Sequence, residues 1–193
     1  MSEAERLKFD KDFAFHGAPT LLGVKCANLI SFDVCEGTIA KYLHEFADKL
    51  SENGLTAIQL CQCRKRTLVY IYNDKMLTAW LSMPQVRQFL SEYGYTCGMS
   101  IEQKLRRLSC RISCESFPHE IGAFLGYPIE DVRGFIGNQG KNCLLCGYWK
   151  VYSEPERAKQ IFTNYGRCRA YLCDKLEQGV DLYQALQFQE VFS

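Results

Sequence analysis

Two β-rich runs that follow each other almost directly, TAIQLCQC (56–63) and TLVYIYN (67–73), constrain the fold of this chain more than any other feature. Only the short polar stretch RKR separates them, which is the pattern of an antiparallel hairpin. A further strand is predicted over residues 24–32, and the aromatic, β-rich stretch NCLLCGYWKVY (142–152) is another candidate. Strands do not alternate with helices, so a dinucleotide-binding fold is not expected. We therefore predict an α+β fold, with a small, mainly antiparallel sheet of three or four strands packed with several helices.

Apolar residues at helical spacing, together with capping signals, mark the helices. Ser100 and Gln103 form a capping-box pattern, and Pro118 suits a first helical position. Ser153 with Glu156 is predicted to cap a long helix near the carboxyl end of the chain. The predicted helices cover residues 4–15, 38–53, 74–81, 84–93, 101–111, 118–125 and 128–136, a long segment after Ser153 and a short one after Asp181.

The length and composition of the chain limit the classes of protein to which it can belong. A chain of 193 residues is long enough for one domain with a real core, so we expect a single globular domain over residues 1–193. A formal net charge of +1 gives no general field to attract nucleic acid or an acidic membrane surface. The amino terminus lacks the pattern of a signal peptide, and no run reaches the ~20 apolar residues of a membrane span. We expect a cytoplasmic protein whose 11 cysteines are reduced thiols, many of them buried as small hydrophobic side chains.

The segment FPHEIGAFLGYPIEDVRGFI (117–136) carries a His-Glu pair among helix-facing apolar residues. It predicts two short helices at an angle, a helix-turn-helix-like pair over residues 118–137. Pro118 would place His119 and Glu120 in a first helical turn, where the helix dipole would keep His119 neutral. Both are candidate catalytic residues, and the alternative is a histidine that hydrogen-bonds a neighbouring loop. A second histidine four residues later is missing, so the zinc-protease pattern is absent, and the acidic start of the second helix argues against DNA recognition.

The cysteines and the segment after residue 15 supply the other candidates. Cys143 and Cys146 form the only C-x-x-C, but a structural zinc site needs a second pair, so we predict no metal site. Cys146 stays a candidate for ligand binding, because the glycine beside it lets a ligand come close. HGAPTLLG (16–23) is predicted to form a turn that leads into the first strand. Four polar residues in and after this turn are ligand-binding candidates: His16, Thr20, Lys25 and Asn28.

Four stretches, HGAPTLLGVKCANL, the 117–136 segment, CGYWKVY and the A-x-x-x-F-x-x-Y-x-x-C run at 158–168, carry a resemblance over nearly the whole chain. Together they resemble an uncharacterised family of anaerobic Firmicutes, the clostridial domain of unknown function number 3793. The family has no established activity, and its genes often lie near flavodoxin and ferrous-iron transport genes, which implies at most an iron or redox association. The chain departs from the family at Gly17, where Cys is frequent, and at Cys143, where an aromatic residue is frequent. The family pattern matches His16, Pro19, Thr20, Lys25, Asn28, His119, Glu120, Gly126, Tyr127, Asp131, Cys146, Gly147, Trp149 and Tyr152.

We expect three of these segments, the turn that begins at His16, the helix start at Pro118 and the strand at residues 146–149, to converge on one cleft that binds a small anionic ligand or an unknown cofactor. Lys25 and helix amino-terminal amides would hold the anion, and Tyr127 or Trp149 would offer a stacking face. The protein is then either an enzyme with His119 and Glu120 as its acid–base pair, or a non-catalytic binder in an iron- or redox-linked role. The alternative is a scaffold or regulator whose helix pair docks a protein, such as a redox protein. Nucleic-acid binding is the least favoured class.

Overall fold

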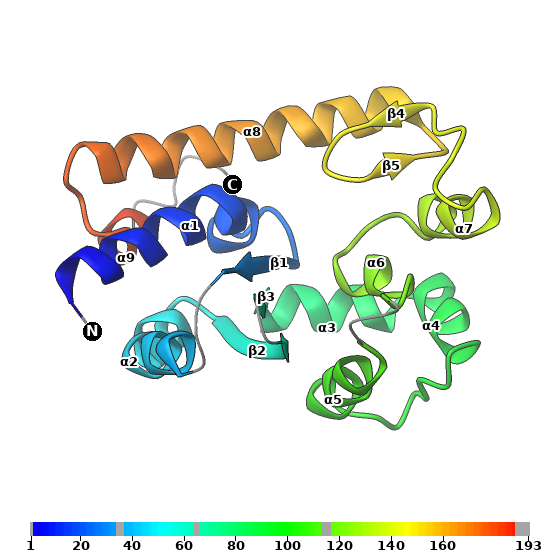
Figure 1. Ribbon diagram of the computed structural model, residues 1–193. Coiled ribbons are helices and arrows are strands. Elements are labelled where there is room, and N and C mark those ends of the chain that lie inside the picture. Colours follow the sequence, from blue (N-terminus) through cyan, green and yellow to red (C-terminus); the bar gives the residue numbers. More distant parts are fainter. Residues whose placement is uncertain (1, 34–36, 64–65, 113–116, 188–193) are drawn as a thin grey trace. The chain divides into compact units, whose positions relative to one another are not determined.

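The predicted hairpin is present in the computed structural model of the protein (Figure 1) and forms two of the three strands of an antiparallel sheet. Strand β2 (Leu55–Cys63) pairs with β3 (Arg66–Asn73), and β1 (Ala27–Phe32) pairs with the other edge of β3. The strand order is therefore β1-β3-β2. The prediction of an α+β fold with a small antiparallel sheet is confirmed. Residues 64–65 of the predicted RKR turn lie outside the described residues.

The structure describes residues 2–33, 37–63, 66–112 and 117–187, and the chain divides into two compact units. The first unit contains the residues up to 76 and those from 167 onward, and the second contains residues 77–166. Both places where the chain passes between the units fall inside helices, α3 (Asp74–Ser82) and α8 (Pro155–Glu177). The prediction of a single domain stays a prediction. Within the described ranges, no helix combines the length and the apolar character needed to cross a membrane.

The first unit packs helices against its sheet. α1 (Glu3–Leu21) contacts β1 and β3, and α2 (Thr38–Glu52) contacts β2. The short helix predicted after Asp181 is present as α9 (Leu182–Leu186), and it contacts α1. Four aromatic side chains that are at most 2% exposed pack together in this core: Phe9, Phe13, Phe32 and Tyr42.

Helix α1 is longer than predicted, because it continues through HGAPTL to Leu21. The prediction of a turn over residues 16–23 was therefore wrong for residues 16–21, and the turn is confined to Leu22 and Gly23 before the bend that leads to β1. Pro19 lies in the last turn, and its carbonyl accepts two later backbone N–H groups at 2.8 and 2.9 Å, which closes the helix end. Gly17 is buried, and a Cβ added there would lie 3.3 Å from Cδ1 of Ile30. Close packing of the helix on the sheet thus outweighs the local preference of Gly and Pro for turns.

The second unit is built from short helices and a small hairpin. α4 (Pro84–Ser91) begins at a proline, and α5 (Ile101–Arg111) carries the predicted capping box. The Ser100 hydroxyl accepts the backbone N–H of Gln103 at 3.2 Å, and the Ser100 backbone N–H donates to the Gln103 side chain at 2.8 Å. The remaining elements are α6 (Ile121–Phe124), α7 (Ile129–Gly137) and the antiparallel pair β4 (Leu145–Cys146) and β5 (Lys150–Val151).

The helix predicted to begin at Pro118 begins later and is shorter. α6 has only four residues, and His119 and Glu120 lie in the turn before it. A single helical turn has little macrodipole, so the expected effect of a helix start on His119 loses its basis. The helix pair itself is present, because α6 contacts α7 and Gly126, with a φ of +73°, turns the chain between them.

The predicted cap of α8 was wrong. The helix begins at Pro155, and Glu154 before it has a φ of 46°. Ser153 donates instead to Oδ1 of Asp131, from its backbone N–H at 2.8 Å and from its hydroxyl at 3.0 Å. Ser153 therefore ties the end of the β4–β5 hairpin to α7.

Candidate functional site

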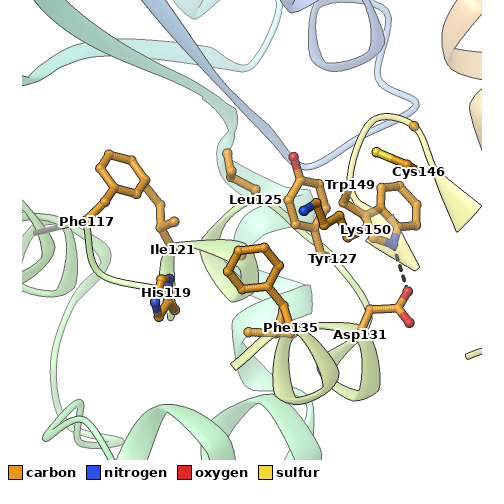
Figure 2. A pocket seen from close by; sticks show the side chains of 13 residues that line it. Phe117, His119, Ile121, Leu125, Tyr127, Asp131, Phe135, Cys146, Trp149 and Lys150 are labelled. Carbon is orange, nitrogen blue, oxygen red and sulfur yellow. Dashed lines mark hydrogen bonds between the residues drawn. The ribbon is translucent and has the colours of Figure 1, made fainter. Parts of the chain in front are cut away.

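A cavity in the second unit brings several candidate residues together (Figure 2). It measures about 400 Å³, within the range of about 300–1,000 Å³ that is usual for ligand pockets. Its mostly apolar lining comes from the segment before α6, from α6 and α7, and from the β4–β5 hairpin. Figure 2 shows Phe117 and His119 on one side, Trp149 and Cys146 on the other, and Phe135 between them. Four of the candidates line this cavity: His119, Tyr127, Cys146 and Trp149.

The carboxylate of Asp131 fixes one wall of the cavity. Asp131 is 2% exposed, and its Oδ2 accepts the indole N–H of Trp149 at 2.7 Å. Its Oδ1 accepts the backbone N–H of Tyr152 at 2.7 Å and the two Ser153 donors described above. Four hydrogen bonds compensate the cost of burying this charge. They also hold the indole in one orientation relative to α7.

Tyr127 and Trp149 form an aromatic wall. Their ring centroids are 5.0 Å apart and their planes differ by 26°, which is a stacked arrangement. Phe162 of α8 packs edge-on against the indole, with centroids 4.6 Å apart. The Tyr127 hydroxyl donates to the carbonyl of Tyr148 at 3.3 Å. Desolvation raises the pKa of Tyr127 to about 12, so at neutral pH the phenol offers a donor and no charge.

Two basic side chains border the cavity near Phe135. The ring of His119 is exposed and packs edge-on against Phe135, with centroids 5.3 Å apart. Nζ of Lys150 lies 5.9 Å from the centroid of the same ring and donates to the carbonyl of Gly140 at 2.6 Å. The thiol of Cys146 is exposed and also faces the cavity. The arrangement combines apolar walls with a basic border, which suits a ligand that has both an apolar part and an anionic group.

Glu120 lies outside the lining of this cavity. Its side chain is 1% exposed, forms an ion pair with Arg111, and accepts the hydroxyl of Tyr95 at 3.4 Å. His119 and Glu120 are adjacent in sequence but contact different groups. Their role as an acid–base pair stays a prediction.

The other four candidates belong to the first unit. The Thr20 hydroxyl donates to Oδ1 of Asn28 at 2.7 Å, and both side chains are buried. Lys25 is 4% exposed, and burial lowers its pKa to about 8. His16 is exposed on α1. The expectation that these residues share one cleft with the candidates of the second unit stays a prediction.

The two cysteines of the C-x-x-C pair differ in exposure. Cys143 is half-buried and Cys146 is exposed. In the part of the chain that the structure describes, no group of three or more His, Cys, Asp and Glu side chains is arranged to hold a metal ion.

Most of the chain matches the model of a known protein family. The model of a family described as "Protein of unknown function (DUF3793)" matches residues 13–186. The chain belongs to this family. No curated protein and no solved structure matches it. The matched range includes the candidate residues of both units, so the resemblance to the domain of unknown function number 3793 is confirmed for this DUF3793 protein.

The DUF3793 pocket also has lining residues that were not among the sequence candidates for binding, and three of them, Asp131, Phe135 and Lys150, shape its walls and border. Asp131 matched the family pattern, but two adjacent acids at a helix start indicate a favourable interaction with the helix dipole and nothing more. Phe135 had the spacing of a core residue, and Lys150 lay in a β-rich stretch. Asp131 could have been selected from the sequence as a pocket residue by its match to the family pattern, together with the tryptophan match 18 residues later.

Proposed function

We propose that this DUF3793 protein binds a small organic molecule in the cavity of the second unit, and that the molecule has a flat apolar part and an anionic group. The observation that carries the proposal is the cavity of about 400 Å³ with an aromatic wall held in place by Asp131. A mostly apolar pocket with a few converging polar groups is the usual form of a small-molecule site.

The apolar part of the ligand fits the walls. Trp149 is 8% exposed, and its indole is already held by the bond to Asp131 and by the ring of Phe162. A ligand that packs on such a wall immobilises few further side chains, so less conformational entropy opposes binding.

The anionic group fits the border formed by Lys150 and His119. The ammonium has three N–H donors, of which the Gly140 carbonyl accepts one. The carboxylate of Asp131 also lines the cavity, but four donors from the protein already bond to its oxygens. Its repulsion of an anionic ligand is thereby reduced.

The sequence left two kinds of function open, an enzyme and a non-catalytic binder, and the geometry favours the binder. General acid–base catalysis needs the acid and the base within reach of the same substrate. Glu120 is engaged by Arg111 and Tyr95, away from the cavity that His119 lines. The iron- or redox-linked role implied by the family stays an expectation, because no contact in the pocket bears on it.

Anilinonaphthalene sulfonate, an anion that carries a flat naphthalene ring, is a suitable probe for the test. We expect saturable fluorescence on titration of the intact protein. Cys146→Trp adds an indole at the cavity and should weaken the affinity by about tenfold or more, which corresponds to about 1.4 kcal/mol. Leu144→Trp adds the same group at a position that is 63% exposed and does not line the cavity, so its affinity should stay unchanged. Equal affinities of the two variants would contradict the proposal.

Docking of a protein partner is the second candidate function. It is favoured by the exposure of Phe117, 46%, at the cavity and of Leu144, 63%, on the segment that leads into β4. Peptides selected on the intact protein from a random library would then bind Phe117→Ser and Leu144→Ser more weakly. The small-molecule proposal instead predicts that Leu144→Ser leaves the affinity for the fluorescent probe unchanged.

A further inference from the structure

A second, smaller cavity in the same unit combines a thiol with two cationic side chains. It measures about 160 Å³ and lies between α4 and α5. Arg87 comes from α4, Lys104 from α5, and Cys97 from the segment that connects the two helices. Ser82, the last residue of α3, and Thr96 also line it. None of these residues takes part in the binding site proposed above.

Cys97 is exposed, and Nη2 of Arg87 donates to its Sγ at 2.7 Å. This hydrogen bond and the charge of Arg87 lower the pKa of the Cys97 thiol, and the charge of Lys104 acts in the same direction. The thiolate, not the thiol, is the nucleophile of cysteine, and cysteines close to Arg and Lys are those that react. The surroundings of Cys97 are therefore those of a reactive cysteine, and not those of a cysteine that only packs in the core.

We propose that Cys97 is a modification site, at which the protein forms a mixed disulfide with a small disulfide that carries carboxylates. The thiol first loses its proton to water. The thiolate then attacks one sulfur of the disulfide, so that a bond forms between Cys97 Sγ and that sulfur while the original S–S bond breaks. The electron pair of the broken bond leaves with the second sulfur as a thiolate. Cys97 is oxidised, and the displaced half of the disulfide is reduced.

The preference for a carboxylate follows from the two cations. Arg87 and Lys104 border the same cavity as the thiol, so a carboxylate attached near the attacked sulfur meets a positive field. A disulfide that carries ammonium groups meets repulsion at the same place. Both side chains are accessible to water, so salt should weaken the discrimination.

Two small disulfides of opposite charge test the proposal, dithiodiglycolate with two carboxylates and cystamine with two ammonium groups. The rate at each cysteine is read by mass spectrometry of peptides from the intact protein. Cys110 is exposed as well, lines neither cavity and serves as the internal reference. We expect dithiodiglycolate to modify Cys97 about threefold faster, or more, than Cys110 at neutral pH. With cystamine, the ratio of the Cys97 rate to the Cys110 rate should be smaller. Added salt should bring the ratios for the two reagents closer together.

Two variants test whether the cations of the cavity, and not the exposure of the thiol alone, determine the reactivity of Cys97. Arg87→Gln and Lys104→Gln should each reduce the preference of Cys97 for dithiodiglycolate over cystamine, and Arg87→Gln should also move the pH profile of the Cys97 rate upward. Arg106→Gln removes an exposed cation of α5 that does not line the cavity, so it should leave the preference unchanged. Equal rates at Cys97 and Cys110, or a preference that persists in both cavity variants, would overturn the proposal. Because the fluorescent probe binds elsewhere, its affinity reports separately on the proposed ligand site.

Discussion

At the scale of single residues, one carboxylate determines the geometry of the pocket. Asp131 accepts the Trp149 indole on one oxygen and the donors of Tyr152 and Ser153 on the other. A buried carboxylate that accepts several hydrogen bonds stabilises a fold mainly because leaving its donors unsatisfied is costly. The aromatic wall and the end of the hairpin therefore depend on the same side chain.

Asp131→Asn should destabilise the protein by about 2 kcal/mol, because an amide accepts the indole and backbone donors more weakly and brings two donors of its own. Urea unfolding followed by circular dichroism measures the free energy of unfolding. Glu130→Gln is the matched control: it removes the neighbouring carboxylate, which is exposed, and should change stability by less than about 0.5 kcal/mol. Equal stabilities of the two variants would mean that the Asp131 hydrogen bonds contribute little.

Lys25 gives the protein a specific pH dependence. Burial lowers its pKa from 10.5 to about 8, so the folded state binds this proton more weakly than the unfolded state does. Below about pH 8 the folded protein bears the full cost of the buried charge. As the pH rises from about 8 to about 10.5, this cost disappears and the contribution of Lys25 to the free energy of unfolding increases.

Lys25→Met should therefore be more stable than the parent protein at pH 7, by up to about 3 kcal/mol. The gain should shrink as the pH approaches 10, because the parent then loses its buried charge. Urea unfolding at both pH values measures the difference. Burial raises the pKa of neighbouring Cys26 to about 11, so this thiol stays mostly uncharged up to pH 10 in both proteins. Lys11→Met, at an exposed position, should show no such pH-dependent gain. A gain of equal size at both pH values would contradict the assignment.

Residue types selected several side chains that the fold brings together. His119, Tyr127, Cys146 and Trp149 were chosen for their chemistry, and all four line one cavity. Their support was not predictable, because the bonds of Asp131 join positions 18 to 22 residues apart in sequence and exist only once α7 and the hairpin have met. The contacts of Glu120 with Arg111 and Tyr95 could not be predicted from the sequence for the same reason.

At the scale of elements, the β4–β5 hairpin approaches two helices closely through glycines. A Cβ added at Gly134 of α7 would lie 2.5 Å from Cβ of Tyr152. A Cβ added at Gly147, between the two strands, would lie 2.2 Å from the ring of Phe162. Neither contact leaves room for a methyl group. The hairpin that carries Trp149 is thus positioned by close backbone approach as well as by hydrogen bonds.

Gly134→Ala should destabilise the protein by about 1–3 kcal/mol, because the added methyl group overpacks the contact with Tyr152. Gly137→Ala is an informative control in the same helix. Nothing lies within 4 Å of a Cβ at that position, so the higher helix propensity of alanine should leave stability unchanged or raise it by up to about 1 kcal/mol. Thermal unfolding of both variants compares the two effects. The same change in both would show that α7 and the hairpin are not closely packed at Gly134.

Sequence patterns predicted elements well where the signal was local. The capping box of α5 and the hairpin of β2 and β3 are both set by neighbouring residues, and both were found. The errors came where distant contacts decide. α1 continues through Gly17 and Pro19 because that end is buried against the sheet, and Ser153 bonds to Asp131 instead of capping α8. Turn and cap propensities are too weak to compete with such burial.

At the scale of the whole molecule, the chain forms two units that are linked through α3 and α8. Linkers rich in Gly, Pro and polar residues are the usual sequence sign of a division in a chain, and both places where this chain passes between its units fall inside helices. Composition therefore gives no signal at these places. The division also separates His16, Thr20, Lys25 and Asn28 from the candidates in residues 77–166. The pocket of the second unit can be tested without assuming how the two groups are arranged.

The two tryptophans of the chain provide the most direct test of this pocket. Their indole N–H groups give two signals in a proton–nitrogen correlation NMR spectrum, which Trp80→Phe assigns. Trp149 lines the cavity and donates to Asp131, whereas Trp80 lies outside the cavity lining and donates to the carbonyl of Ala123 at 2.6 Å. On titration with anilinonaphthalene sulfonate, we predict a saturable shift of the Trp149 signal, with the Trp80 signal little changed. A Trp149 signal that stays in place while the probe binds, or a shift of the Trp80 signal alone, would contradict ligand binding in this cavity.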